Sequence, residues 1–114
     1  MMKIFVDGSG SGKYAFVYDD LSVIKEFRKD GITNNQAEYL AVIEVLRHAP
    51  EKSRITICSD SRLVVEQMKS NYHIKDEKLR ALFGKAHKII ASKNIVVEFA
   101  WVPRKENKAG KFMG

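Results

Sequence analysis

Residues 31–46 read GITNNQAEYLAVIEVL and combine a helix start with a helix that is apolar on almost every side. Thr33 and Gln36 have the spacing of a capping box, in which each side chain binds a free backbone N–H of the first turn. The two asparagines between them are alternative caps. Residues 37–46 are nearly all apolar, which is typical of a buried helix. The sequence therefore predicts a buried helix that begins just after Thr33.

Glu38 places a carboxylate inside this apolar helix. It shares a helix face with Ala41, Val42 and Val45, which follow it by three, four and seven residues. A buried carboxylate needs a cation, a metal or a proton, because an unpaired buried charge is very unfavourable. The alternative is that Glu38 stays hydrated in the first turn and complements the helix dipole. Taken alone, residues 31–46 favour the alternative.

The composition predicts one domain over residues 1–114, with 45% hydrophobic residues to fill a single core. No apolar run approaches the roughly 20 residues of a membrane span, and the N-terminal run is too short for a signal peptide. The only cysteine, Cys58, lies in an apolar run. We therefore expect no disulfide, and we expect the protein to lie in a reducing compartment. We expect a cytoplasmic monomer with no membrane partner and no organic cofactor.

The charge is unevenly distributed along the chain. Residues 1–60 hold 8 Lys/Arg and 9 Asp/Glu, whereas residues 61–114 hold 12 and 5, within a net charge of +6. An acidic half that supplies carboxylates and a basic half that faces phosphates is the pattern of a nucleic-acid enzyme. The alternative is a modestly basic domain whose charge serves only solubility.

The order of elements indicates an α/β fold. Apolar and alternating runs predict five strands, and amphipathic runs predict helices between and after them. The predicted strands are residues 3–6, 14–18, 21–27, 54–58 and 94–102, and helices are predicted at 37–46, from 62, around 79–90 and from 106 to the end. A meander followed by alternating elements predicts a five-stranded mixed sheet, antiparallel first and parallel later, with helices on both faces.

Three carboxylates converge in this scheme. Asp7 ends the first strand and Asp60 ends the fourth, and parallel neighbours place both at the carboxyl edge where α/β sheets bind ligands. Glu38, at the start of the crossover helix, faces the same region. Three hard oxygen ligands without a nearby lysine predict a site for Mg²⁺ or Mn²⁺. Taken singly, Asp7 could be a turn former, Asp60 a helix cap and Glu38 a hydrated residue of the first turn. An explanation without a metal needs all three of these alternatives to hold at once.

The segments FVDGSGSG, TNNQAEYLAVIEVL and SDSRLVVEQM resemble the three central motifs of the type 1 ribonuclease H family. The closing VPRKENKAGKFMG resembles the last motif, and the resemblance covers essentially the whole chain. It implies the ribonuclease H-like fold and a two-metal endonuclease that hydrolyses the RNA strand of RNA–DNA hybrids.

The resemblance also implies roles for individual residues. Asp7 would bridge two metals, while Glu38 and Asp60 would hold the metal on the leaving-group side. Asn35 and Gln36 would read the 2′-hydroxyl and the minor groove, which distinguish RNA from DNA. The residues implied in substrate binding are Gly8, Ser9, Thr33, Asn34, Asn35 and Gln36.

The chain departs from the family pattern in three places. Only residues 70–74 separate the two later helices, so the basic handle of larger members is missing and affinity would rest on Lys/Arg in residues 62–93. The loop that often carries a flexible histidine has Arg104 instead. The fourth carboxylate, expected four residues after the motif asparagine, falls on Lys111. Glu106 is an alternative carboxylate ligand, and Lys111 is an alternative phosphate contact.

These observations predict a metal-dependent ribonuclease H, weakened by Lys111 in place of the fourth carboxylate. The alternative is a catalytically impaired module of the same fold that binds hybrid or RNA. The intact trio of Asp7, Glu38 and Asp60 favours the enzyme, because a pure binder gains little from negative charge beside phosphates. Lys111 favours the binder.

Overall fold

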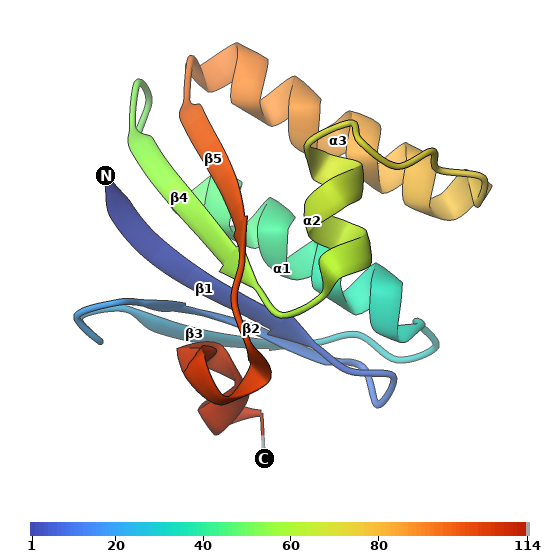
Figure 1. Cartoon of the computed structure of the whole chain (residues 1–114), viewed down its shortest axis with the longest axis horizontal. Helices are drawn as coiled ribbons and strands as arrows, with labels where there is room; N and C mark the ends of the chain where they lie inside the picture. The colour runs from blue at the N-terminus through green and yellow to red at the C-terminus, as the bar shows by residue number, and fades with distance from the viewer. Residues whose placement is uncertain (114) are drawn as a thin grey trace.

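A five-stranded sheet with the strand order β3-β2-β1-β4-β5 forms the centre of the molecule (Figure 1). The computed structural model describes residues 1–113. The strands are β1 (Met2–Gly8), β2 (Lys13–Tyr18), β3 (Ile24–Arg28), β4 (Arg54–Ser59) and β5 (Val96–Trp101). The pairs β1–β2 and β2–β3 are antiparallel, and β1–β4 and β4–β5 are parallel. The predicted mixed sheet is confirmed.

Three α-helices lie against one face of the sheet and two 3₁₀ turns lie against the other (Figure 1). The helices are α1 (Asn34–His48), α2 (Arg62–Met68) and α3 (Glu77–Lys93), and the turns are η1 (Arg104–Glu106) and η2 (Lys108–Phe112). Because side chains alternate along a strand, Ile4 and Val6 face the helices, whereas Phe5 packs with Ala109 of η2.

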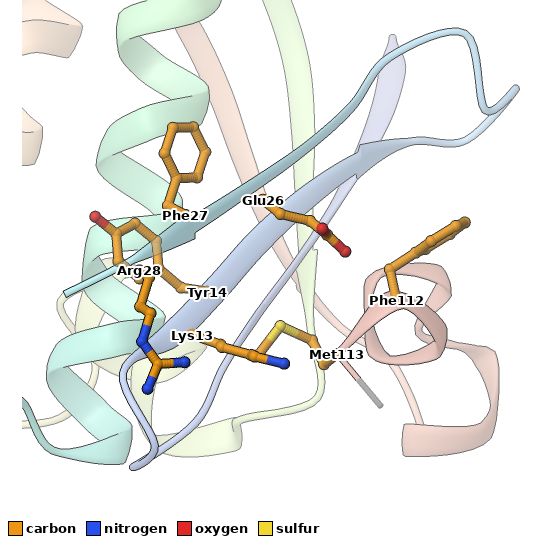
Figure 2. A pocket seen from close by; sticks show the side chains of 7 residues that line it. All are labelled: Lys13, Tyr14, Glu26, Phe27, Arg28, Phe112 and Met113. Atoms are coloured by element: carbon orange, nitrogen blue, oxygen red, sulfur yellow. The ribbon is translucent and has the colours of Figure 1, made fainter. Parts of the chain in front are cut away.

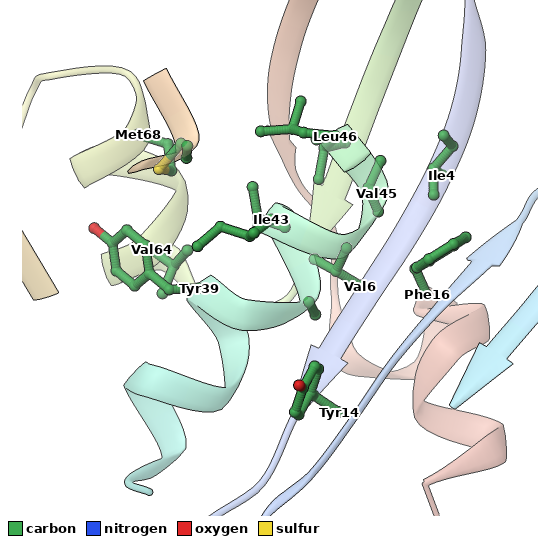
Figure 3. Packing of buried hydrophobic residues seen from close by; sticks show 14 of the residues in the cluster. Ile4, Val6, Tyr14, Phe16, Tyr39, Ile43, Val45, Leu46, Val64 and Met68 are labelled. Carbon is green, nitrogen blue, oxygen red and sulfur yellow. The ribbon is translucent and has the colours of Figure 1, made fainter. Parts of the chain in front are cut away.

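The main core lies between the sheet and α1 (Figure 3). Helix α3 packs on α1. Tyr39, Ile43 and Leu46 of α1 are fully buried. Tyr39 extends towards α2, where its hydroxyl donates a 2.7 Å hydrogen bond to Gln67 Oε1. The helix that the sequence predicts as buried is therefore the central layer of the molecule.

Both ends of α1 are held by side chains. At its start, Gln36 N donates to Thr33 Oγ1 at 3.1 Å, and Thr33 N donates to Gln36 Oε1 at 3.0 Å, which confirms the capping box. At its end, Lys93 Nζ of α3 donates to the carbonyls of Leu46, Arg47 and Ala49 at 3.0, 2.6 and 2.8 Å. A cation at the carbonyl end of a helix also complements its dipole.

Two strands begin later than the sequence predicts, because the residues before them adopt a left-handed backbone. Leu21, at φ 62°, belongs to a turn in which Asp20 accepts hydrogen bonds from Ser22. Asn94, at φ 53°, caps the C-terminus of α3. Asparagine is tolerated in this conformation more readily than most residues.

The C-terminal region forms two 3₁₀ turns rather than the single helix predicted from Glu106. Asn107 separates them, since its backbone is extended and its side chain accepts a 3.0 Å hydrogen bond from Ala109 N. Beyond η2, the chain borders a groove of about 250 Å³ beside β2 and β3 (Figure 2). The side chains that line it are Lys13, Tyr14, Glu26, Phe27, Arg28, Phe112 and Met113, and it includes none of the three predicted ligands.

No helix within residues 1–113 is both long and apolar enough to span a bilayer. Cys58 is buried and is the single cysteine of the chain. His48 and His73 are exposed. His87 differs, because it is half-buried against Phe83, with a ring-centroid distance of 4.3 Å, and its Nε2 atom is buried without a hydrogen-bond partner in the described structure.

Candidate active site

Strand pairing brings Asp7 and Asp60 to one edge of the sheet. Phe5 of β1 lies opposite Cys58 of β4 in a parallel register, and each aspartate follows two residues later. Asp7 is the penultimate residue of β1, and Asp60 is the first residue after β4. The two carboxylates therefore emerge at the carboxyl ends of neighbouring parallel strands, the position where α/β sheets place ligands.

Glu38 joins them from α1. It is the fifth residue of the helix, one position beyond the first turn, and only 5% of it is exposed. The alternative of a hydrated carboxylate in the first turn is therefore wrong. One oxygen from each of Asp7, Glu38 and Asp60 lies within 4.8 Å of the others.

Gly8 sets the distance between β1 and α1. A Cβ atom at this position would lie 2.5 Å from the carbonyl carbon of Ala37 and 2.6 Å from the Glu38 nitrogen, so only glycine fits. The same close approach lets Gly8 N donate hydrogen bonds to Asp7 Oδ1 at 3.0 Å and Glu38 Oε1 at 2.9 Å. Ser59 Oγ donates to Glu38 Oε2 at 3.3 Å. The glycine thus fixes the carboxylate pair through its backbone.

The environment of Glu38 disfavours its negative charge. Burial, followed by a hydrogen bond to Asp7 and the negative charge of that residue, raises the pKa of Glu38 to about 9. Without a bound cation, Glu38 is therefore protonated at neutral pH. A metal that binds here must displace that proton.

A positive charge already touches two of the carboxylates. Arg104 Nη1 lies 3.3 Å from both Asp7 oxygens and 3.2 Å from Asp60 Oδ2. The negative charges of Asp7 and Asp60 raise the pKa of Arg104 further. The arginine comes from the predicted histidine-loop position, and its side chain remains 68% exposed.

Asn107 ties the C-terminal turns to the site. Its amide nitrogen donates to the Val6 carbonyl at 2.9 Å and to Asp60 Oδ2 at 3.0 Å, and the residue is 1% exposed. From the sequence, Asn107 served only as the residue from which the position of the fourth carboxylate was counted. Its structural role was not predicted. The residue type was the only signal in the sequence, because an asparagine side chain can bind nearby backbone groups and so favours turns over a continuous helix.

The count from Asn107 leads to Gly110 rather than to Lys111. In a 3₁₀ turn the chain returns to the same side after three residues, and Gly110 N donates to the Asn107 carbonyl at 3.1 Å. A Cβ at Gly110 would lie 3.4 Å from Asp7 Oδ2, whereas Lys111 is exposed. The expected position, Lys111, came from the family spacing of four residues after the motif asparagine. Glu106 is also exposed and lies outside the carboxylate group found within residues 1–113.

The predicted substrate-binding residues gather at the start of α1. Gly8 and Ser9 lead into the β1–β2 loop, and a Cβ at Gly10 of this loop would lie 2.8 Å from Asn34 Oδ1. Thr33 and Gln36 are engaged in the capping box, while Asn35 is half-buried. These residues form a rim beside the carboxylates, and their part in binding stays a prediction.

One aromatic and one basic side chain also lie beside Asp60. Trp101 Nε1 donates to the Asp60 carbonyl at 3.1 Å, and the Arg62 guanidinium lies 4.4 Å from the centre of the indole ring. Trp101 is 40% exposed. An exposed indole beside an arginine suits contact with a nucleic-acid strand.

Comparison with known proteins agrees with this geometry. The RNase H family model matches residues 1–110. The "Bifunctional protein Rv2228c" of Mycobacterium tuberculosis is 32% identical over 103 residues, which cover 87% of this chain and 28% of that protein. The chain thus spans under a third of the length of the curated relatives it matches.

Solved structures share the fold. The N-terminal RNase H domain of the same mycobacterial protein superposes with a TM-score of 0.72 at 25% identity, covering 96% of this chain and 94% of that one. LC11-RNase H1, solved in complex with an RNA/DNA hybrid, has a TM-score of 0.84 at 22% identity and covers both chains completely. The family match over nearly the whole sequence, together with the shared fold, shows that the chain belongs to the RNase H family.

Proposed function

We propose that this domain is a metal-dependent endoribonuclease that hydrolyses the RNA strand of RNA–DNA hybrids. The observation that carries the proposal is the group of Asp7, Glu38 and Asp60, whose oxygens lie within 4.8 Å at the carboxyl edge of the sheet. Membership of the RNase H family supports the same reaction.

The donor set fits a hard divalent cation such as Mg²⁺ or Mn²⁺. Asp7, Glu38 and Asp60 would hold it, and the positive charge of such an ion would favour the ionised form of the buried Glu38. When bound, the ion would polarise a phosphate oxygen and lower the pKa of a water molecule. Family resemblance implies a pair of ions, but only these three carboxylates gather within residues 1–113.

The chain's own residues supply positioning. Gly8 and Ser59 hold the two oxygens of Glu38, and Asn107 holds Asp60, so the ligands are oriented before substrate arrives. Arg104 has guanidinium N–H groups beyond the one that touches the carboxylates, and these face solvent where a phosphate would lie.

Hybrid recognition is assigned to the rim at the start of α1. Gln36 lines a groove of about 330 Å³ together with Lys29 and Lys78. Two lysines beside a candidate reader of the 2′-hydroxyl suit a duplex that has one RNA strand. LC11-RNase H1, which shares the fold, was solved with an RNA/DNA hybrid bound.

A second candidate function is a hybrid-binding module with little turnover. The observation that favours it is Arg104, which already neutralises part of the charge of Asp7 and Asp60. A cation must compete with this ion pair, so metal binding would be weak.

Cleavage of a labelled RNA–DNA hybrid in Mg²⁺ or Mn²⁺ tests the proposal. We expect cleavage of the RNA strand, none of a DNA duplex of the same sequence, and loss of at least 100-fold in Asp7→Asn. Asp20→Asn is the matched control, because Asp20 is exposed in the β2–β3 turn, where its Oδ1 accepts hydrogen bonds from Ser22. Binding of the hybrid without cleavage in either metal would support the second candidate instead.

A further inference from the structure

The C-terminal turns leave one side of Asp7 without a ligand. Gly110 lies beside Asp7, since a Cβ there would lie 3.4 Å from Asp7 Oδ2. Its position is fixed, because Ala109 before it is fully buried against Phe5 and Asn107 binds the Ala109 nitrogen. Gly110 therefore faces the carboxylates but offers them no side chain.

Gly110 does not need to be glycine for backbone reasons. The glycines with a positive φ are Gly12 and Gly31, so the backbone of Gly110 accepts other residues. The contact of 3.4 Å is ordinary van der Waals distance, unlike the clash that a side chain at Gly8 would make. A Cβ atom at position 110 would therefore fit beside Asp7 without a clash.

Arg104 fills the space that such a side chain would reach. Its Cζ atom would lie 4.0 Å from a Cβ at position 110, and its Nη1 contacts both oxygens of Asp7 and one of Asp60. The guanidinium is permanently charged. On this side of Asp7, a second divalent ion would find no carboxylate and would meet a positive charge.

We infer that this chain binds one divalent cation, at Asp7, Glu38 and Asp60, and that Arg104 takes the place of a second cation on the Gly110 side of Asp7. The inference rests on the proposed function, because it assumes that the three carboxylates bind metal. It differs from the paired ions that the family resemblance implies. Two ions that act together lie about 4 Å apart and share a carboxylate, and here a guanidinium contacts both oxygens of the carboxylate that would be shared, Asp7.

Titration calorimetry with Mn²⁺ in the absence of nucleic acid measures the number of ions directly. We expect one ion per wild-type chain. In Arg104→Ala we expect one ion bound at least tenfold more tightly, since the competing positive charge is gone. In the double variant Arg104→Ala/Gly110→Asp we expect two ions, because a carboxylate replaces the missing ligand.

The matched control is Arg104→Ala/Lys111→Asp, which adds the same carboxylate one residue later, on the exposed side of η2. It should bind one ion. Electron paramagnetic resonance provides a second readout, because two Mn²⁺ ions about 4 Å apart couple magnetically and a single ion does not. Circular dichroism verifies that each variant is folded.

The outcomes distinguish a failure of the single-ion inference from a failure of the proposed function. A wild-type chain that binds two ions overturns the single-ion inference and leaves the proposed function intact, as does a folded Gly110→Asp double variant that still binds one. Two ions in the Lys111→Asp control would also overturn it. A wild-type chain that binds no Mn²⁺ even at millimolar concentration contradicts both the inference and the proposed metal site.

Discussion

Single residues in this protein combine packing with chemistry. Glu38 is the clearest case, since it lies in the helix that forms the core and also faces the candidate metal site. Asn107 is another, because one amide group holds the end of β1 and orients Asp60. Substitutions at such positions change stability and metal binding together, so each test needs a measurement of both.

Glu38 makes stability depend on pH in a direction opposite to that of most carboxylates. Its pKa is about 9 in the folded protein against an ordinary 4.5, so folding favours the protonated form. Its contribution is fully present below pH 4.5 and is lost as the pH rises towards 9. We expect the free energy of unfolding of the wild type, minus that of Glu38→Gln, to fall across this range in EDTA. Urea denaturation at several pH values measures it, and a constant difference would contradict the raised pKa.

Asn107→Ala tests the link between the C-terminal turns and β1. The substitution removes two donated hydrogen bonds and one accepted bond, and it leaves the Val6 carbonyl buried without its partner. We expect a loss of about 2–3 kcal/mol in the free energy of unfolding, measured by urea denaturation. Asn71→Ala, which removes one exposed bond to Glu66, should change it by less than about 0.5 kcal/mol. Equal effects in the two variants would count against the role of Asn107.

At the scale of elements, periodicity predicted the sheet and the main helices, while the ends of elements depended on single residues. The capping box at Thr33 could be read from the sequence because it is local. The late start of β5 could not, because it depends on the left-handed backbone of Asn94. The C-terminal turns were predicted as one helix, because the extended backbone of Asn107 that separates them could not be read from the sequence. The convergence of Asp7, Glu38 and Asp60 followed from strand order alone, but the contact of Arg104 with two of them required the folded loop.

We expect that one substitution in helix α3, outside the candidate active site, stabilises the protein. The Nε2 atom of His87 is buried without a hydrogen-bond partner in the described structure, and a buried polar atom left unpaired is unfavourable. We expect His87→Leu to raise the free energy of unfolding by about 1 kcal/mol. The exposed His73 provides the control, and His73→Leu should be neutral within about 0.5 kcal/mol. A destabilised His87→Leu would indicate that the imidazole contributes more by packing on Phe83 than it loses through its unpaired nitrogen.

At the scale of the whole molecule, most of the positive charge lies in the second half of the chain, after the segments that supply Asp7, Glu38 and Asp60. The second half of the chain is strongly basic, and the outer side of α3 carries exposed Lys78, Arg80, Lys85 and Lys88. Lys78 reaches the groove beside Gln36, so part of this charge lies next to the candidate reader of the hybrid. The chain therefore has a basic surface for phosphates even though only a short loop connects α2 and α3.

Binding of nucleic acid should depend strongly on salt and on the presence of an RNA strand. Contacts with phosphates release counterions, so affinity falls steeply as the salt concentration rises. In EDTA, which prevents cleavage, we expect tighter binding to an RNA–DNA hybrid than to a DNA duplex of the same sequence, measured by fluorescence anisotropy. Gln36→Ala should reduce the preference for the hybrid, whereas Lys78→Ala should weaken binding to both duplexes about equally. Equal affinity of the wild type for both would contradict a reader at the start of α1.

The absence of a side chain at Gly8 affects how the site would bind a cation. Because β1 touches α1 at this point, the spacing of Asp7 and Glu38 is set by the same contact that packs the core. The carboxylates are therefore preorganised, and a cation does not have to draw β1 and α1 together when it binds. Folding and cation binding are thus thermodynamically linked: an ion that favours the folded state must raise the melting temperature, and a looser core must weaken its affinity.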